Sequence, residues 1–547
     1  MEIRSRIAVE LAAVAIIAAT ALGFGIRGEG IASGIVDPIL HAGAQDEAVY
    51  GHAAARMVRS GDWMTPIFLD RFMLNKPPLL MWAGAASMLL FGIHPLALRL
   101  PVLAAGVLCC VLIYGWARKT RSMAAGLGAV ALLLGMPLFY SMNRIFMTDA
   151  LLTLFVVAAM LLLAFDPRWE RGVTPIAFGA LSGAAVMTKS AAGLLPLLIL
   201  AVYWVLAGSK ERPPGRRILL ALGITALVAA PWHIYQLLLH KDWFLAEYVR
   251  FQLLGSGVTA PSRYNQDSNF WFYSKTLLRT DPVLVGLWLT SVPWLAMAWR
   301  KPEKTHARLL TAWFLAAALV LGIFGTRAAY YLLPLLPALV LMSVEFSPLF
   351  RGRMASIACA ALIVVFGARV DYKPTAVAAA SALDSYSRLR RGNELVIVSP
   401  DDEFYASVID VPKVRYLYLT PLDATKTSEF FYRLGMIVTG DQFCSLPRLF
   451  PVFEQRLQAW KLPPDLHPEA TLIDGGSPSE LARVIECSPD RDFMIPEPLR
   501  AIAIDAAKAT HWAAGEQSGK FFLLSKTSTR RAAGSIAPGT VVRNLPQ

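Results

Sequence analysis

The sequence predicts an α-helical protein that crosses a membrane about eleven times and ends in a soluble α/β domain. Of its 547 residues, 56% are hydrophobic and only 17% are charged, and the mean hydropathy is +0.49. This composition excludes an ordinary soluble protein of that size. A transmembrane helix needs about 20 mainly apolar residues to cross a hydrocarbon core roughly 30 Å thick. We place such helices at 7–26, 96–117, 122–140, 149–165, 174–188, 191–207, 217–238, 281–299, 308–325, 329–346 and 353–369.

Two apolar segments need separate interpretation. The segment 79–92 is shorter than a span and follows Pro77 and Pro78, so we expect a helix in the membrane interface. The first segment follows Arg4 and Arg6, as in a signal peptide. No clear small-residue cleavage site follows it, so we expect a retained signal anchor.

The net charge of +13 would suit nucleic-acid binding, but the basic residues are sorted by loop. Cytoplasmic loops of membrane proteins carry an excess of Lys and Arg. With the N-terminus in the cytoplasm, every short cytoplasmic loop is basic: 118–121, 168–171, 210–217, 300–308 and 351–353. The other side then carries 27–95, 141–148, the turn near 189–190, 239–280, 326–328 and the long tail.

The chain becomes more polar after Val370. Strand-like runs appear at 394–400, 413–419 and 520–526, and helix-compatible runs at 375–391 and 477–486. We therefore divide the chain into a membrane domain, 1–370, and a soluble periplasmic α/β domain, 371–547.

The five cysteines fall into two groups. Cys109, Cys110 and Cys359 lie in predicted spans, where cysteine packs as a small apolar residue. Cys444 and Cys487 are the pair in the tail, and an oxidising compartment permits a disulfide between them.

Asp46 and Glu47 stand in the loop 27–95, at the start of an expected amphipathic helix, 47–60. Acidic residues are favoured at helix N-termini because of the exposed amides and the helix dipole. A carboxylate at the mouth of a membrane bundle also suits a general base, which must come within hydrogen-bond reach of the proton it removes. Both interpretations remain open for this pair.

A second carboxylate, Asp149, ends a short connection between two predicted spans. It is placed to cap the helix that begins at Ala150. A cap does not require Arg144 five residues earlier, however, and a second acidic residue on the same side as Asp46 suggests a shared site. Capping and catalysis are compatible here.

Lys76 precedes two prolines that stiffen its backbone. An interfacial lysine can simply extend its ammonium group to water. A fixed ammonium group at the membrane surface is also what a lipid phosphate requires. Further donors expected on the same side are Arg250, Arg263, Arg327, Tyr330 and Tyr331.

In their order along the chain, these residues and several short stretches around them resemble the pattern of a known family. It is that of the bacterial GT-C glycosyltransferases related to aminoarabinose transferase and to the protein O-mannosyltransferases. The resemblance covers about residues 1–350 and not the tail. The matching stretches are Asp46-Glu47 with Tyr50, SGDWMTP, Lys76-Pro77-Pro78, Arg99-Leu100-Pro101, Arg144 to Asp149, Thr188-Lys189, Ala230-Pro231-Trp232, Phe270 to Tyr273 and Tyr331 to Pro334.

The resemblance implies a GT-C fold and an enzyme that moves a sugar from a polyprenyl-phosphate carrier to an acceptor, with inversion at the anomeric carbon. It implies Asp46 as the catalytic aspartate, which would act as the base, and Asp149 as a second acidic position. It also implies Lys76, Arg327 and Tyr331 as ligands of the carrier phosphate. From the residues themselves we add Glu47 as a catalytic candidate, Arg250 as a phosphate ligand, and Tyr50 and Arg144 as substrate contacts. The aminoarabinose enzymes have an arginine and a glutamate where this chain has Val49 and Asn75, which removes one phosphate contact and one acidic sugar contact.

Several alternatives remain. The acceptor is either lipid A or another glycolipid on the outer side of the inner membrane, or, as in the mannosyltransferases, a protein Ser or Thr. A lipid transporter or flippase would also place charges at one end of a bundle, but the sequence shows no internal repeat and no matched pair of interrupted helices. Asp46, Glu47 and Asp149 offer oxygen ligands for a divalent cation, but their spacing is not diagnostic and no metal site is assigned.

Overall fold

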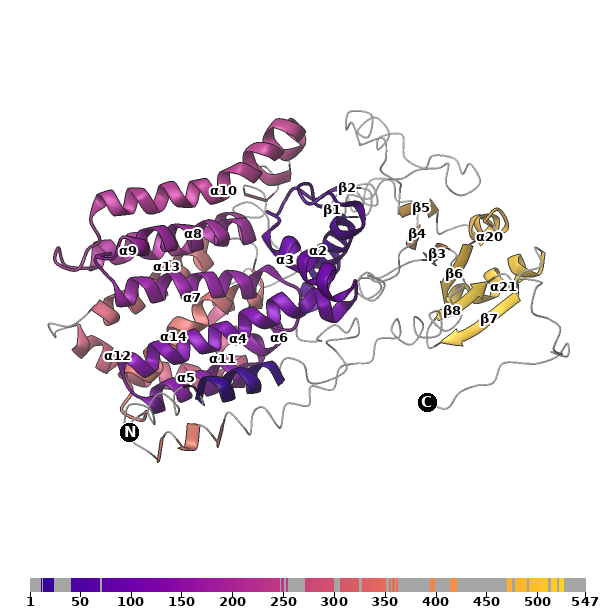
Figure 1. Ribbon diagram of the computed structural model, residues 1–547. Coiled ribbons are helices and arrows are strands. Elements are labelled where there is room, and N and C mark those ends of the chain that lie inside the picture. Colours follow the sequence, from indigo (N-terminus) through magenta and orange to yellow (C-terminus); the bar gives the residue numbers. More distant parts are fainter. Residues whose placement is uncertain are drawn as a thin grey trace.

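The protein has a bundle of apolar helices and, beyond one end of it, a small mixed β-sheet (Figure 1). The computed structural model describes residues 11, 13–23, 41–68, 71–245, 247–249, 252–253, 271–299, 305–323, 327–350, 354–355, 357–359, 361–362, 394–398, 414–420, 470–474, 478–488, 491–509, 513–518 and 521–525.

The described bundle begins with a short apolar helix, Ala13–Gly23. The further helices are α2 (His41–Ser60), α3 (Leu79–Phe91), α4 (Pro95–Thr120), α5 (Met123–Gly135), α6 (Pro137–Met142), α7 (Thr148–Phe165), α8 (Val173–Lys189), α9 (Leu195–Leu206), α10 (Gly215–Phe244), α11 (Phe272–Thr280), α12 (Pro282–Ala298), α13 (Thr305–Ile323) and α14 (Leu336–Phe346), with 3-10 helices η3 (Ser190–Leu194) and η5 (Ala329–Leu335). A two-stranded hairpin, β1 (Ile67–Phe68) and β2 (Arg71–Phe72), lies between α2 and α3.

Within the described residues, six helical stretches are long and apolar enough to cross a membrane, or seven if the bent pair α11 and α12 forms one span. The protein is therefore a multi-pass membrane protein, while the count of eleven crossings stays a prediction. At 13 residues, α3 is too short to cross, in agreement with the interfacial helix expected at 79–92. The span expected at 122–140 is instead two helices, α5 and α6, which meet at Met136 before Pro137.

The chain reverses direction at η3. Along α8, Gly179 and Gly183 contact Ala221 and Thr225 of α10, so both helices start at the same end of the bundle and run in parallel. The short link from α9 to α10 therefore requires α9 to return to that end. Ser190 has a positive φ of 48° at the break, and Gly193 lies against the backbone of Ala185. This tight reversal leaves Lys189 at the end of α8.

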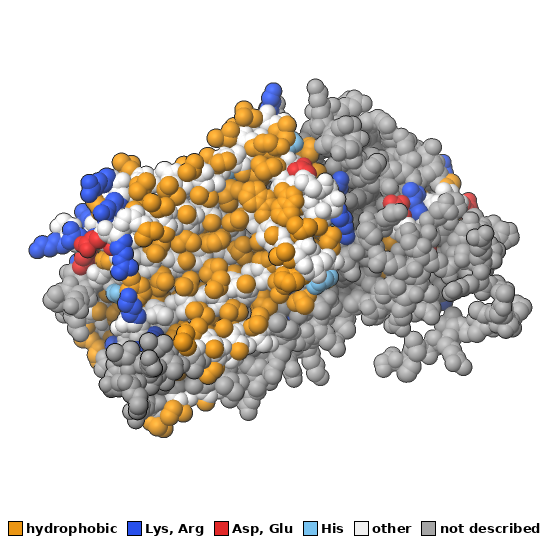
Figure 2. Space-filling model, viewed as in Figure 1, with side chains coloured by type: hydrophobic (Ala, Val, Ile, Leu, Met, Phe, Trp, Pro, Cys, Tyr) orange, Lys and Arg blue, Asp and Glu red, His pale blue; other side chains and the backbone are white. Residues whose placement is uncertain are grey.

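The surface of the bundle matches a membrane setting. A band of hydrophobic side chains covers its lateral face in Figure 2. The exposed apolar residues of the bundle include Val205 of α9 and Leu219 and Leu238 of α10. Lys and Arg side chains gather at the end opposite α2 and α3 in Figure 2. Arg168, which follows α7, and Arg216, in the first turn of α10, are both exposed. Apolar side chains need no polar partner in lipid, whereas charged ones are stable at the water interface.

The sheet has the strand order β5-β4-β3-β6-β8-β7. The first four strands pair in parallel, and β8 pairs antiparallel with both of its neighbours, β6 and β7. Its strands are β3 (Glu394–Val398), β4 (Val414–Thr420), β5 (Ala470–Asp474), β6 (Arg491–Pro496), β7 (Ala513–Ser518) and β8 (Phe521–Ser525), with helices α20 (Pro478–Glu486) and α21 (Arg500–Ala509).

Strands occupy all three runs where the sequence predicts them, and α20 occupies the predicted run 477–486. The helix expected at 375–391 lies outside the described residues, and the domain boundary at 370 stays a prediction. Cys109, Cys110 and Cys359 are buried free thiols. Cys444 lies outside the described residues, so its disulfide with Cys487 also stays a prediction.

We predict that Gly193→Ala destabilises the protein. A Cβ at this position would lie 2.2 Å from the carbonyl oxygen of Ala185, and overpacking of this kind costs about 1–3 kcal/mol. Gly223→Ala in α10 is the matched control because its Cβ would meet nothing within 4 Å, and alanine favours a helix by up to about 1 kcal/mol. Thermal unfolding in detergent should show a lower Tm for Gly193→Ala only, and equal Tm values would contradict the close approach.

Candidate active site

Glu47 and Arg99 form a buried ion pair. Arg99 Nε donates to Glu47 Oε1 at 2.6 Å and its second nitrogen donates to Oε2 at 2.7 Å, with side-chain exposures of 2% and 4% for Arg99 and Glu47. The backbone N–H of Phe146 also donates to Oε1 at 2.8 Å. These three donors occupy both carboxylate oxygens, which favours a structural role for Glu47, and its catalytic role stays a prediction. The carboxylate joins α2, α4 and the segment before α7.

Asp46 lies on a different face of α2. Adjacent helical residues point about 100° apart, whereas residues four apart share a face. Asp46 is hydrogen-bonded to Tyr50 one turn later, and α2 begins at His41, so Asp46 is not in the first turn. The interpretation of Asp46 as a helix N-terminal acid is therefore wrong.

The environment of Asp46 is suited to a base. Burial raises its pKa, the charges of Lys76 and Lys189 lower it, and the Asp149 charge raises it. Burial and the nearby Asp46 charge raise the pKa of Tyr50 well above its ordinary value. The phenol therefore remains protonated and donates to the carboxylate.

Asp149 pairs with Lys189. Asp149 is in the first turn of α7 and Lys189 in the last turn of α8, the helix ends at which an anion and a cation are respectively favoured. Since α7 and α8 are antiparallel neighbours, the two ends meet, and Lys189 Nζ donates to Asp149 Oδ1 at 2.6 Å. No side chain caps α7. The predicted capping role of Asp149 is therefore wrong, whereas its place at a polar site is supported.

Two tyrosines of η5 flank this pair. Lys189 Nζ lies 4.5 Å from the ring centroid of Tyr331 and 5.5 Å from that of Tyr330. A cation over an aromatic ring is stabilised by about 0.5–2 kcal/mol, more when it is desolvated. The rings thus hold the ammonium group in place without occupying its N–H donors.

Lys76 is held by a fixed loop. The carbonyl of Met64 accepts hydrogen bonds from Trp232 Nε1 at 2.9 Å and Gln236 Nε2 at 2.7 Å, both on α10. The Met73 N–H then closes the loop onto the carbonyl of Pro66 at 2.8 Å. Burial and the Lys189 charge lower the pKa of Lys76 to about 8, while the Asp46 and Asp149 charges oppose this shift.

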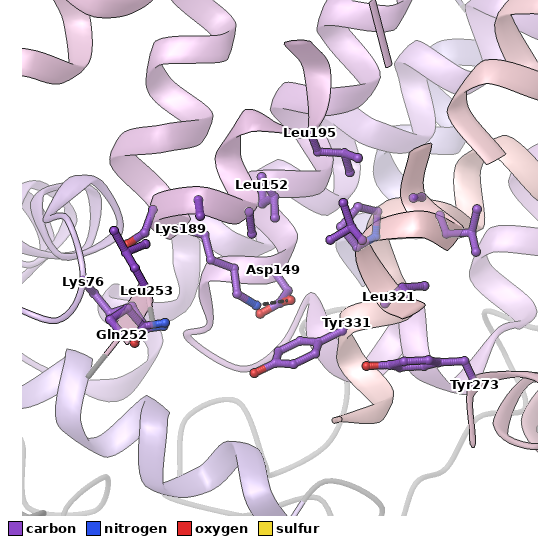
Figure 3. Close-up of a pocket in the computed structure, with 17 residues that line it drawn as sticks. Lys76, Asp149, Leu152, Lys189, Leu195, Gln252, Leu253, Tyr273, Leu321 and Tyr331 are labelled. Atoms are coloured by element: carbon purple, nitrogen blue, oxygen red, sulfur yellow. Dashed lines mark hydrogen bonds and ion pairs between the residues drawn. The ribbon is translucent and has the colours of Figure 1, made fainter. Parts of the chain in front are cut away.

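Lys76, Asp149, Lys189 and Tyr331 border a cavity of about 180 Å³. In Figure 3 the Asp149–Lys189 pair lies between Lys76 and Tyr331, with Leu152, Leu195 and Leu321 beyond it. The rest of the wall is largely apolar: Ala191, Ala192, Leu253, Ala317, Val320, Pro334 and Leu335, with Ser190, Gln252 and Tyr273 as further polar members. The cavity therefore combines charged groups with a long hydrophobic wall.

The structure brings most of the predicted site residues together. Lys76, Asp149 and Tyr331 line the cavity, and Asp46 with Tyr50 is linked to them by charge and hydrogen bonding. Arg144 does not line this cavity. Its guanidinium contacts the Tyr140 hydroxyl and borders a smaller cavity.

The other predicted phosphate ligands are less directly placed. Arg327 interacts by charge with Tyr273, a residue of the cavity wall. Arg250 and Arg263 lie outside the described residues. Lys189 was missed as a site residue, although its place in a turn on the same predicted side as Asp149 was a usable signal.

The acidic residues do not form the ligand set considered for a divalent cation. Glu47 is occupied by Arg99, and Asp149 is neutralised by Lys189. Among the described residues there is no group of three or more His, Cys, Asp or Glu side chains that could hold a metal ion.

Comparison with known proteins identifies the fold. The chain superimposes on ArnT from Cupriavidus metallidurans bound to undecaprenyl phosphate with a TM-score of 0.67, over 96% of this chain and 98% of that one, at 15% identity. The chain has the GT-C fold of ArnT. The fold class predicted for the membrane part is therefore confirmed.

Sequence comparison agrees with the ArnT fold. Residues 75–235 match the family described as dolichyl-phosphate-mannose-protein mannosyltransferase. The undecaprenyl phosphate-α-4-amino-4-deoxy-L-arabinose arabinosyl transferases of Proteus mirabilis and Aeromonas salmonicida are 27% and 29% identical over 55% and 54% of this chain. The chain spans about half the length of the curated relatives it matches, 54% in both cases. The resemblance proposed from the motifs is thereby confirmed.

We predict that Glu47→Gln destabilises the ArnT-like bundle by about 3–5 kcal/mol, because it leaves the buried Arg99 charge without its partner. The double variant Glu47→Gln with Arg99→Met should recover part of that loss. Thermal unfolding of wild type, the two single variants Glu47→Gln and Arg99→Met, and the double variant measures the coupling. A Glu47→Gln protein that is as stable as wild type would contradict the structural role assigned to the carboxylate.

Proposed function

We propose that the protein is an inverting membrane glycosyltransferase that moves a sugar from a polyprenyl-phosphate carrier to a lipid acceptor, such as lipid A or another glycolipid. The observation that carries this proposal is the cavity in which Lys76 and Lys189 stand beside a hydrophobic wall. A polyprenyl phosphate has the same two parts, an anionic head and an apolar chain. The undecaprenyl phosphate bound to Cupriavidus ArnT supports the same ligand class.

The proposed reaction needs one base. An acceptor hydroxyl attacks the anomeric carbon and Asp46 takes its proton. The bond from that carbon to the carrier phosphate breaks, and its electron pair leaves with the phosphate oxygen on the opposite face. Phosphate is a good leaving group, so no carboxylic acid has to protonate it, unlike glycoside hydrolysis with its acid and base carboxyl groups.

The cations would act on the leaving phosphate, whose negative charge grows as the bond breaks. Preorganised donors aimed at developing charge in a water-poor site contribute several kcal/mol each. Lys76 and Lys189 would fill this role, Tyr331 would add a hydrogen bond, and Arg250 and Arg327 stay predicted further contacts. Asp149 would hold the Lys189 ammonium group in place beside the cavity.

We place this site on the outer side of the inner membrane, with the N-terminus in the cytoplasm and the α/β domain in the periplasm. Basic side chains gather at the end of the bundle opposite α2 and α3 (Figure 2). Arg168 follows α7, and Lys210 and Arg216 lie between α9 and α10 or at the start of α10; all three are exposed. This arrangement supports the orientation because cytoplasmic loops are enriched in Lys and Arg.

We predict that Asp46→Asn lowers turnover by about 10²–10⁴-fold, the usual contribution of a general base, while undecaprenyl phosphate still binds. Lys76→Ala should instead weaken that binding. The assay is sugar transfer from undecaprenyl-phosphate sugars by protein in lipid nanodiscs, with glycolipids and Ser/Thr peptides as separate acceptors. Glu170→Gln is the control because its side chain is 71% exposed at the far end of the bundle.

Transport without transfer would give a different result. If the protein moves lipid across vesicles, releases no sugar with any acceptor and is insensitive to Asp46→Asn, a flippase replaces the enzyme. Transfer to peptides alone would make the acceptor a protein.

Carrier binding should also depend on pH. A lysine with a pKa of about 8 loses its charge as the pH rises through 8, so affinity for undecaprenyl phosphate should fall between about pH 7.5 and 9. A phosphate monoester has its second pKa near 6 and does not titrate in this interval. Lys76→Arg, which stays charged, should flatten the profile. An equally steep fall in this variant would assign the titration to another group.

A further inference from the structure

We propose that Gln252 is a further ligand of the carrier phosphate, and that a hydrogen bond between Tyr248 and His233 holds it at the cavity. This inference rests on the proposed function, to which it adds one binding residue and one positioning contact. The three residues come from two neighbouring parts of the chain, the second half of α10 and the segment 245–253 that follows it.

The Gln252 amide lies close to the charge proposed to bind the phosphate. Its side chain lines the cavity, as does that of Lys76, and Figure 3 shows both on one side of the Asp149–Lys189 pair. A side-chain amide has two N–H donors and no charge. It can therefore donate to a phosphate oxygen without adding to the charge repulsion by which Lys189 lowers the pKa of Lys76.

Gln252 belongs to a segment that folds back along α10. The helical geometry of α10 is broken at Lys241, which has φ 39° and ψ −109°. The described residues from 245 to 253 are π-helical. A non-glycine residue with a positive φ is strained and persists only where its surroundings hold it. The break therefore needs contacts that tie the segment to α10.

Tyr248 makes such contacts. Its hydroxyl lies 2.7 Å from Nε2 of His233, and Nδ1 of His233 lies 2.8 Å from the carbonyl oxygen of Ala229. A carbonyl oxygen only accepts, so Nδ1 carries the proton and Nε2 accepts a hydrogen bond from the Tyr248 hydroxyl. The Tyr248 ring also stacks on Phe244, with centroids 5.0 Å apart and 11° between the planes. Tyr248 is almost completely buried, so water does not compete for this bond.

The anchor at Tyr248 is connected to the cavity. Tyr248 and Gln252 are four residues apart, about one helical turn. Leu253 packs against the apolar cluster that contains Tyr248 and Trp232, and it also lines the cavity. The same part of α10 holds the loop that carries Lys76. The Tyr248 hydroxyl therefore positions Gln252 relative to Lys76.

The test measures binding of undecaprenyl phosphate, and of undecaprenol, which lacks the phosphate, to the full-length protein in nanodiscs. Gln252→Leu keeps the bulk of the side chain and removes the amide. It should weaken binding of undecaprenyl phosphate by about tenfold, the loss of one hydrogen bond to a charged group, and leave binding of undecaprenol within about twofold. Tyr248→Phe keeps the stacked ring and should weaken binding of undecaprenyl phosphate by about threefold or more.

The double variant tests whether Tyr248 acts through Gln252. If it does, Tyr248→Phe should change binding by less than about twofold in the Gln252→Leu background. His233→Leu removes the acceptor of the same bond and should reproduce the loss seen with Tyr248→Phe. Tyr203→Phe is the matched control and should leave binding unchanged, because Tyr203 is also buried but its hydroxyl lies 3.5 Å from the carbonyl oxygen of Glu211, outside the cavity wall.

The outcomes separate this inference from the proposed function. If wild type binds undecaprenyl phosphate and Gln252→Leu binds it as tightly, or if undecaprenol binding falls by the same factor, the phosphate contact is overturned and the carrier proposal stands. Equal losses from Tyr248→Phe in the wild-type and Gln252→Leu backgrounds would overturn the positioning role. If wild type does not bind undecaprenyl phosphate, the carrier proposal fails and the inference fails with it.

Discussion

The buried ion pair between Glu47 and Arg99 is the interaction on which the site depends. A charge inside an apolar bundle is stable only when it is paired and hydrogen-bonded, so both side chains must remain together. Their bonds, with that of the Phe146 N–H to the same carboxylate, fix α2 against α4 and against the segment that leads into α7. Asp46 directly precedes Glu47, and Asp149 follows Phe146 by three residues. The Glu47–Arg99 pair therefore helps to position the carboxylates of both Asp46 and Asp149.

A second pair, Asp149 with Lys189, differs from the first in its surroundings. Arg99 and Glu47 are bound to each other through both carboxylate oxygens, and both are almost completely buried. Lys189 uses one close bond to Asp149, keeps an exposure of 11% and stands over two aromatic rings at the cavity. An ammonium group has three donors, so this lysine can bind a ligand without leaving its partner. The first pair therefore stabilises the fold, while the second offers a cation to the cavity.

The sequence predicted the setting of the site better than its internal connections. Hydropathy and loop charge predicted a multi-pass bundle, and motif order predicted the ArnT-like fold and the importance of Asp46, Lys76, Asp149 and Tyr331. The roles of Glu47 and Lys189 were not predictable in this way. Two adjacent carboxylates look alike in a sequence, and only the turn of about 100° between them on α2 sends one toward Arg99. The partner of Asp149 depends on the antiparallel packing of α7 and α8. In the sequence, Lys189 is marked only by its place near a turn and in one of the matching stretches. Strands β5, β6 and β7 were also missed, since short strands in a polar tail have weak periodicity.

The cavity places the side chains proposed to bind the apolar chain of the carrier apart from one of the charges proposed to bind its phosphate. The apolar wall is assembled from α7, α9, α13 and the 3-10 helices η3 and η5, so binding of an apolar chain is spread over many side chains. Lys76 lies instead in the turn between β2 and α3, outside those helices. A substitution of Lys76 removes one positive charge from the cavity without changing the apolar wall or either ion pair. The contacts proposed for the phosphate and those proposed for the apolar chain can therefore be tested by separate substitutions.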